Sequence, residues 1–366
     1  MTVEGISLPK VSVVDPSPSH QESLRAALDK HFDITFFKDS SYALDKFYQT
    51  PPNVAIIDDS APKVDGQKLA ELIFTDPQLM KIPVIMTGKY VPINAHNVGS
   101  GKARNYLQWP FKKIQIFEEL SSVINDAAVT EWEVLPEVHK QALTMTVTEY
   151  QDIADAISKG EPIQYDTAKE SCAPLLEAIS SGGAQDLLKS VQSHHNYTYV
   201  HSLRVATLLT MFGHGIGMRG DNLSIMATGG LLHDVGKMVT PENILSKPGK
   251  LDDDEWPIMQ GHVLHSRDLL QAGSDITKGA RIIAEQHHEK IDGSGYPLGL
   301  KGKEMSELAR MSSICDIFGA LTDSRSYKPA FSAEKSFAIL ADMGPSIDQG
   351  LLKVFKELIS DTKTVG

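Results

Sequence analysis

The sequence predicts a multidomain protein, in which an N-terminal α/β domain with a doubly wound parallel sheet precedes a C-terminal all-α domain. Three observations carry this prediction. The chain has 366 residues, which exceeds the usual size of one compact domain. Its first third alternates short β-branched runs with amphipathic segments, whereas the remainder loses the strand pattern and keeps helical spacing. Hydrophobic residues make up 41% of the chain and charged residues 22%, as in chains that fold, which excludes disorder and coiled coil as the main state.

The expected strands of the first domain are short and apolar on both sides, as in a sheet that helices cover on two faces. These strands, and the helices expected between them, occupy residues 11–14, 54–57 and 82–86, and residues 21–31 and 67–74. In open sheets of this kind, ligands bind outside the carboxyl ends of the strands. Asp15 and Asp58 directly follow two of the strands, so we expect both carboxylates at that edge.

The rest of the chain is expected to be helical. Residues 128–195 carry helix-compatible spacing that is interrupted by breaks such as Pro136 and Gly182-Gly183, and we interpret them as a helical linker that begins the helical domain. Residues 196–366 again favour helices. The predicted domains are therefore 1–127, 128–195 and 196–366.

Charge and cysteine content exclude several classes of protein. The chain has 35 Lys and Arg against 47 Asp and Glu, a net charge of −12, so it lacks the electrostatic basis for gripping a nucleic-acid polymer. Two cysteines exclude a disulfide framework and fit a reducing compartment. No uncharged stretch approaches the roughly 20 residues that span a bilayer. We therefore expect a cytoplasmic protein that does not insert into a membrane.

Histidine and aspartate residues gather in the helical part of the chain. Most of the 13 histidines lie between 194 and 288, several of them beside apolar helical runs. Five imidazoles and two carboxylates on helices that share one core are suitable ligands for two borderline divalent metals. They are His201, His233, Asp234, His262, His287, His288 and Asp316. Asp234 is placed to bridge the two ions, and a two-metal centre of this kind suits phosphoester hydrolysis.

Residues 9 to about 127 resemble a response-regulator receiver domain, which has a flavodoxin-like fold. The resemblance rests on the run 52–66, on Thr87 followed by glycine, and on Pro110-Phe111. It places the phosphoacceptor at Asp58 and implies that this domain regulates the rest of the chain.

Two positions depart from the receiver pattern. Pro16 stands where receivers carry a second acid, and Trp109 stands where they carry a lysine. Phosphoryl transfer to a carboxylate needs Mg²⁺ held by clustered acids and a cation on the phosphate. We therefore expect a degenerate receiver that forms a homodimer or docks on a partner protein, with phosphorylation of Asp58 as the alternative.

Residues 196–355 are similar to the HD-GYP family, a subgroup of the HD phosphohydrolases. The matching motifs are His201, His233-Asp234, Lys237, His262, His287-His288-Glu289, the run 292–297 with Gly295-Tyr296-Pro297, and Asp316. The resemblance implies an all-helical domain with a two- or three-metal site, usually of iron or manganese. It also implies hydrolysis of the bacterial messenger cyclic di-GMP to pGpG or GMP.

The same resemblance assigns roles within this chain. The five histidines and two aspartates would be the metal ligands, with Asp234 and Lys237 as the catalytic residues. Lys237 would contact the scissile phosphate or a bound hydroxide, Tyr296 would contact the ligand, and Arg325 with Lys328 would neutralise its phosphates. Members with a third metal carry a glutamate where this chain has a tyrosine at 197, so we expect two ions. Iron or manganese is expected, and zinc or nickel would also fit imidazole-rich sites.

Two other functions stay open. A cyclic di-GMP sensor or protein-interaction module with weak turnover is favoured by the degenerate receiver and by Gly319, which replaces a second family aspartate. The complete ligand set argues against it, because an inactive relative would be free to lose ligands. An HD hydrolase for another nucleotide is the third reading, for which the Gly-Tyr-Pro loop is unexpected.

Overall fold

The computed structural model describes most of the chain in two compact units. The described residues are 9–29, 32–90, 103–111, 115–116, 119–120, 123, 132, 135–192, 197–245, 247, 250–273, 276–323 and 331–361. The first unit holds the described residues up to 123, and the second holds those from 132 onward.

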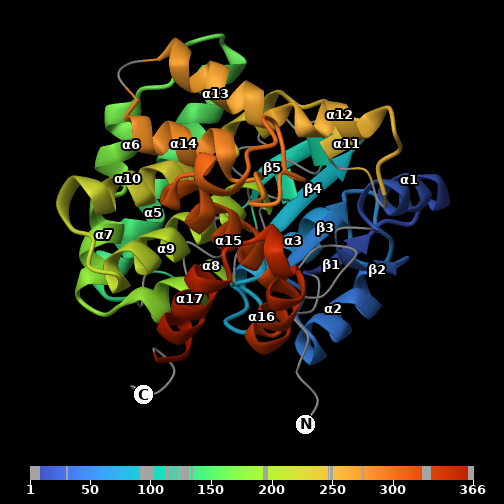
Figure 1. The fold of residues 1–366 in the computed structure, drawn as a ribbon. Helices are drawn as coiled ribbons and strands as arrows, with labels where there is room; N and C mark the ends of the chain where they lie inside the picture. The colour runs from blue at the N-terminus through green and yellow to red at the C-terminus, as the bar shows by residue number, and fades with distance from the viewer. Residues whose placement is uncertain are drawn as a thin grey trace. The chain divides into compact units, whose positions relative to one another are not determined.

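The first unit is built on a five-stranded parallel sheet with the strand order β2-β1-β3-β4-β5, drawn in blue to cyan in Figure 1. The strands are β1 (Lys10–Val14), β2 (Asp33–Phe37), β3 (Val54–Asp58), β4 (Val84–Gly88) and β5 (Ala103–Gln108). This is the flavodoxin-like order of a doubly wound sheet, so the predicted fold class of this part is confirmed.

Three described helices pack on the sheet: α1 (Pro18–Leu28), α2 (Ser40–Gln49) and α3 (Gly66–Thr75). Each follows a residue whose side chain accepts a backbone N–H of the first turn, namely Ser17, Asp39 and Asp65. Successive residues of β3 point to opposite faces. Ile56 packs in the apolar cluster of α1, and Ile57 packs in that of α2 and α3.

Strands β2 and β5 were not predicted, and β4 begins two residues later than expected. β2 lies at one edge of the sheet and alternates more and less exposed residues, so it lacks the continuous apolar run of a central strand. β5 forms the opposite edge.

The second unit is helical, and its described residues contain no strand beyond one isolated bridge between Asp292 and Lys301. Its α-helices are α5 (Glu137–Ser158), α6 (Tyr165–Ser171), α7 (Ala173–Ser180), α8 (Ala184–Gln192), α9 (Tyr197–Gly215), α10 (Gly220–Leu232), α11 (Glu242–Leu245), α12 (Glu255–Gln260), α13 (His262–Ala272), α14 (Lys278–Gln286), α15 (Glu307–Thr322), α16 (Ala333–Asp342) and α17 (Gln349–Asp361). Short 3₁₀ segments occupy η2 (Val235–Val239), η3 (Gly302–Glu304) and η4 (Gly344–Ser346). The predicted all-helical class is confirmed.

Helix α10 contacts both α9 and α14, and two adjacent glycines allow this close packing. A Cβ on Gly230 would lie 2.6 Å from the Cα of Ala206 in α9. A Cβ on Gly229 would lie 2.6 Å from a side-chain carbon of Ile283 in α14. Both neighbours can therefore approach the end of α10, where His233 and Asp234 follow.

Helices α5 to α8, which the sequence suggests as a linker and the start of the helical domain, belong to the same compact unit as the histidine-bearing helices. Tyr150 of α5, for example, lies buried against Ser202 of α9, with 3.4 Å between the two hydroxyl oxygens. Among the described residues, no helix has both the length and the apolar character needed to cross a membrane.

Candidate metal centre

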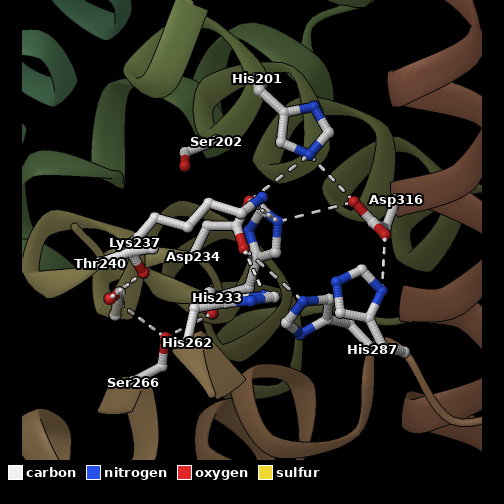
Figure 2. Close-up of polar contacts among 12 residues, drawn as sticks. His201, Ser202, His233, Asp234, Lys237, Thr240, His262, Ser266, His287 and Asp316 are labelled. Carbon is white, nitrogen blue, oxygen red and sulfur yellow. Dashed lines mark hydrogen bonds and ion pairs between the residues drawn. The ribbon is translucent and has the colours of Figure 1, made fainter. Parts of the chain in front are cut away.

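The structure brings the seven predicted ligand residues together in the helical unit. Figure 2 labels six of them, all except His288, and shows that they point toward one another. They come from α9 (His201), the junction of α10 with η2 (His233 and Asp234), the start of α13 (His262), the end of α14 (His287 and His288) and α15 (Asp316). All are buried except His288, which is partly exposed.

The carboxylate of Asp234 stands between two groups of imidazoles. Its Oδ2 lies 3.2 Å from Nε2 of His233 and 3.7 Å from Nε2 of His201. Its Oδ1 lies 3.3 Å from Nε2 of His262 and 3.7 Å from Nε2 of His287. Each oxygen therefore faces a different pair of ring nitrogens, which is the arrangement of a carboxylate that bridges two cations.

Asp316 forms a second link between the same two groups. Its Oδ1 lies 2.9 Å from Nε2 of His201, and its Oδ2 lies 3.5 Å from Nδ1 of His288. The two groups are compact, because the candidate ligand atoms within each lie within 4.8 Å of one another. They are His201, His233 and Asp234 in the first, and His262, His287 and His288 in the second.

Several buried atoms of the cluster make no hydrogen bond with the described residues. They are Nε2 of His233, His262 and His287, and Oδ1 of Asp234. An unsatisfied buried polar atom costs about 1–3 kcal/mol, so four of them in one place require another partner. Imidazole nitrogens with a carboxylate oxygen are the donor atoms that borderline divalent cations bind, and the residues present therefore fit such ions.

The other ring nitrogen of these three histidines faces a backbone carbonyl. Nδ1 lies 2.7 Å from the carbonyl oxygen of Gly230 for His233, and 2.6 Å from that of Met259 for His262. For His287 the corresponding distance, to Ala284, is 3.0 Å. A carbonyl oxygen only accepts, so each Nδ1 carries a proton, and Nε2 is the ring nitrogen that is directed at the centre.

Burial and charge act in opposite directions on these groups. Burial lowers the pKa of His288 to about 3, and it lowers the pKa of His287 well below the ordinary range. Burial alone would also lower the pKa of His233, but Asp234 and Asp316 outweigh it and raise that pKa to about 10. Burial thus favours the neutral form of His287 and His288, which is the form in which an imidazole binds a metal ion.

Lys237 reaches the bridging carboxylate from η2. Its ammonium lies 2.5 Å from Oδ2 of Asp234, and its side chain is 21% exposed. Lys237 follows Asp234 by three residues, and this spacing places its ammonium beside the centre while part of the lysine side chain stays exposed to solvent.

Two aromatic rings continue from the cluster toward the surface. The ring of Tyr296 lies against His288, with 4.7 Å between centroids, and Trp256 of α12 meets Tyr296 edge-on at 6.2 Å. Trp256 is 47% exposed. The sequence motifs predicted Tyr296 but not Trp256. Trp256 becomes noticeable only in the structure, as an exposed tryptophan beside the buried polar cluster.

The loop that carries Tyr296 is fixed by Glu289, which is fully buried. The carboxylate of Glu289 accepts the backbone N–H groups of Leu298, Gly299 and Leu300 at 2.6, 3.2 and 2.9 Å. A Cβ on Gly295 would come within 2.3 Å of the backbone of Lys290, so only glycine fits there. Glu289 was part of the predicted motif, but its role in the loop was not predicted.

Arg325 and Lys328, the predicted phosphate contacts, lie outside the described residues. Gly319 lies beside His201, since a Cβ at this position would be 3.6 Å from Cε1 of that ring. Asp323, which the sequence did not single out, also contacts His201, with 2.9 Å between Oδ2 and Nδ1.

The receiver-like unit has a polar cluster of its own at the carboxyl edge of its sheet, as expected for Asp15 and Asp58. Nδ1 of His20 lies 3.0 Å from Oδ2 of Asp15, and its ring stacks on Trp109 at 4.0 Å. Thr87 donates its hydroxyl to Asp58 at 2.9 Å. Burial raises the pKa of Asp15, and the charge of Asp58 raises it further. A histidine and a tryptophan thus occupy the surroundings of the acids, and the phosphorylation state of Asp58 stays a prediction.

Comparison with known proteins gives a family match for the helical unit and several relatives of known name. Residues 185–351 match the HD domain family. Cyclic di-GMP phosphodiesterase PA4108 of Pseudomonas aeruginosa is 32% identical over 200 residues, which cover 50% of this chain and 48% of that protein. A protein of Vibrio cholerae named probable cyclic di-GMP phosphodiesterase is 28% identical over 370 residues, covering 97% of this chain and 79% of that protein. The 3'3'-cGAMP-specific phosphodiesterase 2 of Vibrio cholerae is 36% identical over 174 residues, covering 47% and 33%. The chain thus spans about half of the Pseudomonas protein and a third of the last one.

Proposed function

We propose that this chain, whose residues 185–351 match the HD domain family, is a metal-dependent phosphodiesterase that hydrolyses cyclic di-GMP to pGpG or GMP. The observation that carries the proposal is the carboxylate of Asp234, whose two oxygens face separate groups of imidazoles. Two cations held side by side stabilise the attacking and the leaving oxygen of an in-line phosphoryl displacement.

The ligand residues would hold two divalent ions, iron or manganese, and zinc or nickel would also fit. His201, His233 and Asp316 would serve one ion, His262, His287 and His288 the other, and Asp234 both. When bound, such ions would supply a Lewis acid for the phosphate and an activated water. The protein would orient Nε2 of His233, His262 and His287 toward the ions through the contacts of their Nδ1 atoms with backbone carbonyls.

Lys237 is proposed to act on the reacting phosphate. Its ammonium lies at the partly open side of the cluster, beside the oxygen of Asp234 that faces the first imidazole group. Negative charge grows on the phosphate oxygens as the P–O bond breaks, and a fixed cation there stabilises the transition state more than the bound substrate. Arg325 and Lys328 are proposed to bind the phosphates of the dinucleotide.

The aromatic pair suits a nucleotide substrate. Tyr296 lies between His288 and Trp256, and about half of the Trp256 side chain is exposed to solvent near the centre. Bases stack on such side chains, with a contribution of about 1–3 kcal/mol per base. A purine of the dinucleotide would be held here while its phosphate lies at the ions.

A second candidate substrate is 3'3'-cGAMP. It is favoured by the relative of 36% identity whose name specifies this dinucleotide. Both molecules present the same phosphodiester ring, and they differ in one purine base. The two activities therefore share the metal centre, and stacking near Trp256 would decide between them.

The receiver-like unit is proposed to regulate the phosphodiesterase as a dimerisation or docking module. The proposed location is the cytoplasm, because the proposed substrate is an intracellular messenger. A sensor with weak turnover is the alternative function. The unsatisfied ring nitrogens support a site that holds metal ions, and turnover by the metal-loaded chain distinguishes the enzyme from the sensor.

Turnover by the full chain, purified without oxygen and loaded with Mn²⁺ or Fe²⁺, tests the proposal. Cyclic di-GMP, 3'3'-cGAMP and a simple aryl phosphodiester should be compared at equal concentration. We expect hydrolysis of a cyclic dinucleotide at least roughly a hundredfold faster than that of the aryl diester, the scale that oriented binding supplies. Metal-loaded protein that binds cyclic di-GMP without hydrolysing it would support the sensor instead.

A further inference from the structure

His201 is held differently from the other buried histidines of the cluster. Nδ1 of His233, His262 and His287 faces a backbone carbonyl. Nδ1 of His201 instead lies 2.9 Å from the carboxylate Oδ2 of Asp323, while its Nε2 lies 2.9 Å from Asp316. Each of its two ring nitrogens therefore lies at hydrogen-bonding distance from a different carboxylate.

The two carboxylates come from one face of α15. Asp323 follows Asp316 by seven residues, which is about two helical turns, so both side chains point the same way. Asp323 stands at the C-terminal end of the helix, where its N–H bonds to the carbonyl of Gly319 at 2.9 Å. It is only 5% exposed. A carboxylate at such a helix end would ordinarily lie in solvent, away from the partial negative charge of that terminus.

Arg204 accounts for the buried position of this carboxylate. Its Nε lies 2.8 Å from Oδ1 of Asp323, and its guanidinium donates to the carbonyl of Thr322 at 3.0 Å. Arg204 follows His201 by three residues on α9, so both project from the same face of that helix. One carboxylate thus ties two residues of α9 to the end of α15.

Gly319 leaves the place between the two aspartates without a side chain. A Cβ there would lie 3.6 Å from Cε1 and 3.8 Å from Nδ1 of His201, and 3.3 Å from Val205. A carboxylate built on position 319 could therefore reach the same edge of the imidazole that Asp323 reaches.

We propose that Asp323 is a positioning residue for the metal centre, which holds His201 with Nε2 directed at the first ion and fills the role that position 319 cannot fill with glycine. The proposal rests on the metal centre of the proposed function, but on no particular substrate. A carboxylate on Nδ1–H fixes the ring orientation and tautomer and makes Nε2 a stronger donor. Arg204 balances the charge of this buried carboxylate.

Two variants and a rescue test the assignment. Asp323→Asn keeps the size and one acceptor but removes the charge, and it leaves Arg204 an oxygen to bind. Asp323→Ala removes the carboxylate altogether. Gly319→Asp combined with Asp323→Ala returns a carboxylate to the same edge of His201. Asp342→Ala, an exposed aspartate of α16, is the matched control.

The first readout is the ring N–H resonance of His201 in the full-length, ¹⁵N-histidine-labelled chain, which needs neither metal nor substrate. We expect the proton on Nδ1 to have a ¹H resonance that is shifted strongly downfield in the wild type, because Nδ1 lies 2.9 Å from Asp323. This downfield shift should be lost in Asp323→Ala and regained in the rescue variant. The second readout is Mn²⁺ affinity. We expect two ions per chain in the wild type, with one of the two bound roughly 10–100-fold more weakly in Asp323→Ala and most of that loss restored by Gly319→Asp.

An unchanged His201 resonance together with unchanged Mn²⁺ affinity in Asp323→Ala would overturn the proposal. So would a folded rescue variant that regains stability but not metal affinity, since that result would make Asp323 a purely structural partner of Arg204. If Asp323→Ala fails to fold, Asp323→Asn decides by the same two measurements. A wild-type chain that binds no Mn²⁺ but shows the expected resonance changes would contradict the proposed function while leaving the contact of Asp323 with His201 in place.

Discussion

Replacing Gly230 with alanine should disable the metal centre without altering any ligand. The added Cβ would lie 2.6 Å from the Cα and 2.9 Å from the backbone nitrogen of Ala206. Nonbonded carbons rest about 3.5–4.0 Å apart, so α9 and α10 must separate by on the order of 1 Å. His201 belongs to α9 and His233 ends α10, and the two first-ion ligands would therefore move apart.

The expected cost has a steric and a conformational part. Forcing an extra methyl group into a packed helix crossing costs about 1–3 kcal/mol of unfolding free energy. The higher helix propensity of alanine offsets at most about 1 kcal/mol of this. A displacement of about 1 Å among catalytic groups lowers turnover roughly 100-fold.

Gly213→Ala on α9 is the matched control. Its Cβ would meet only side-chain atoms of Met226, Leu223 and Met218, at 3.2–3.3 Å, and these can move aside. It gains the same helix propensity, so the difference between the two variants isolates the steric effect. Urea unfolding, Mn²⁺ binding and cyclic di-GMP turnover of both variants provide the comparison. Equal stability and equal turnover in the two would refute the packing argument.

Three further predictions concern the substrate and the receiver-like unit. Lys237→Ala should lower kcat more than it raises KM, whereas Arg325→Ala should raise KM roughly tenfold or more. Steady-state kinetics of both variants at verified metal content would show this difference. If both variants change only KM, and by the same factor, Lys237 does not act in the transition state. Trp256→Ala should raise KM for cyclic di-GMP roughly tenfold with metal content unchanged, because a base would lose its stacking partner. An unchanged KM would exclude a stacking role for Trp256. A small phosphodonor should give no stable adduct on Asp58 that changes activity, and intact-mass measurement with a parallel turnover assay checks this.

The fold class could be predicted from the sequence because central strands and helices differ in apolar periodicity. Strand β3 is buried along its whole length, so its residues form a continuous apolar run that no surface element would carry. Edge strand β2 has partners on one side only, and its exposed positions tolerate polar residues. Its pairing with β1 is a tertiary contact, which local sequence does not encode.

The ligand residues could be predicted as a set because few functions require so many histidines among apolar helical runs. Their supporting residues could not. Asp323 and Arg204 become recognisable only when α9 and α15 pack, since an aspartate at a helix end and an arginine within a helix are common on surfaces. The glycine pair at 229–230 is likewise explained only by the two helices that approach it.

The metal content of Asp234→Ala tests the central claim most directly. The wild-type chain and the control variant Asp342→Ala, purified separately by the same procedure without oxygen, should each retain two divalent ions and hydrolyse a cyclic dinucleotide. Because the carboxylate of Asp234 faces both groups of imidazoles, its loss should reduce both the metal content and the turnover. Full occupancy of two ions in Asp234→Ala, with turnover unchanged, would contradict the bridging role of Asp234.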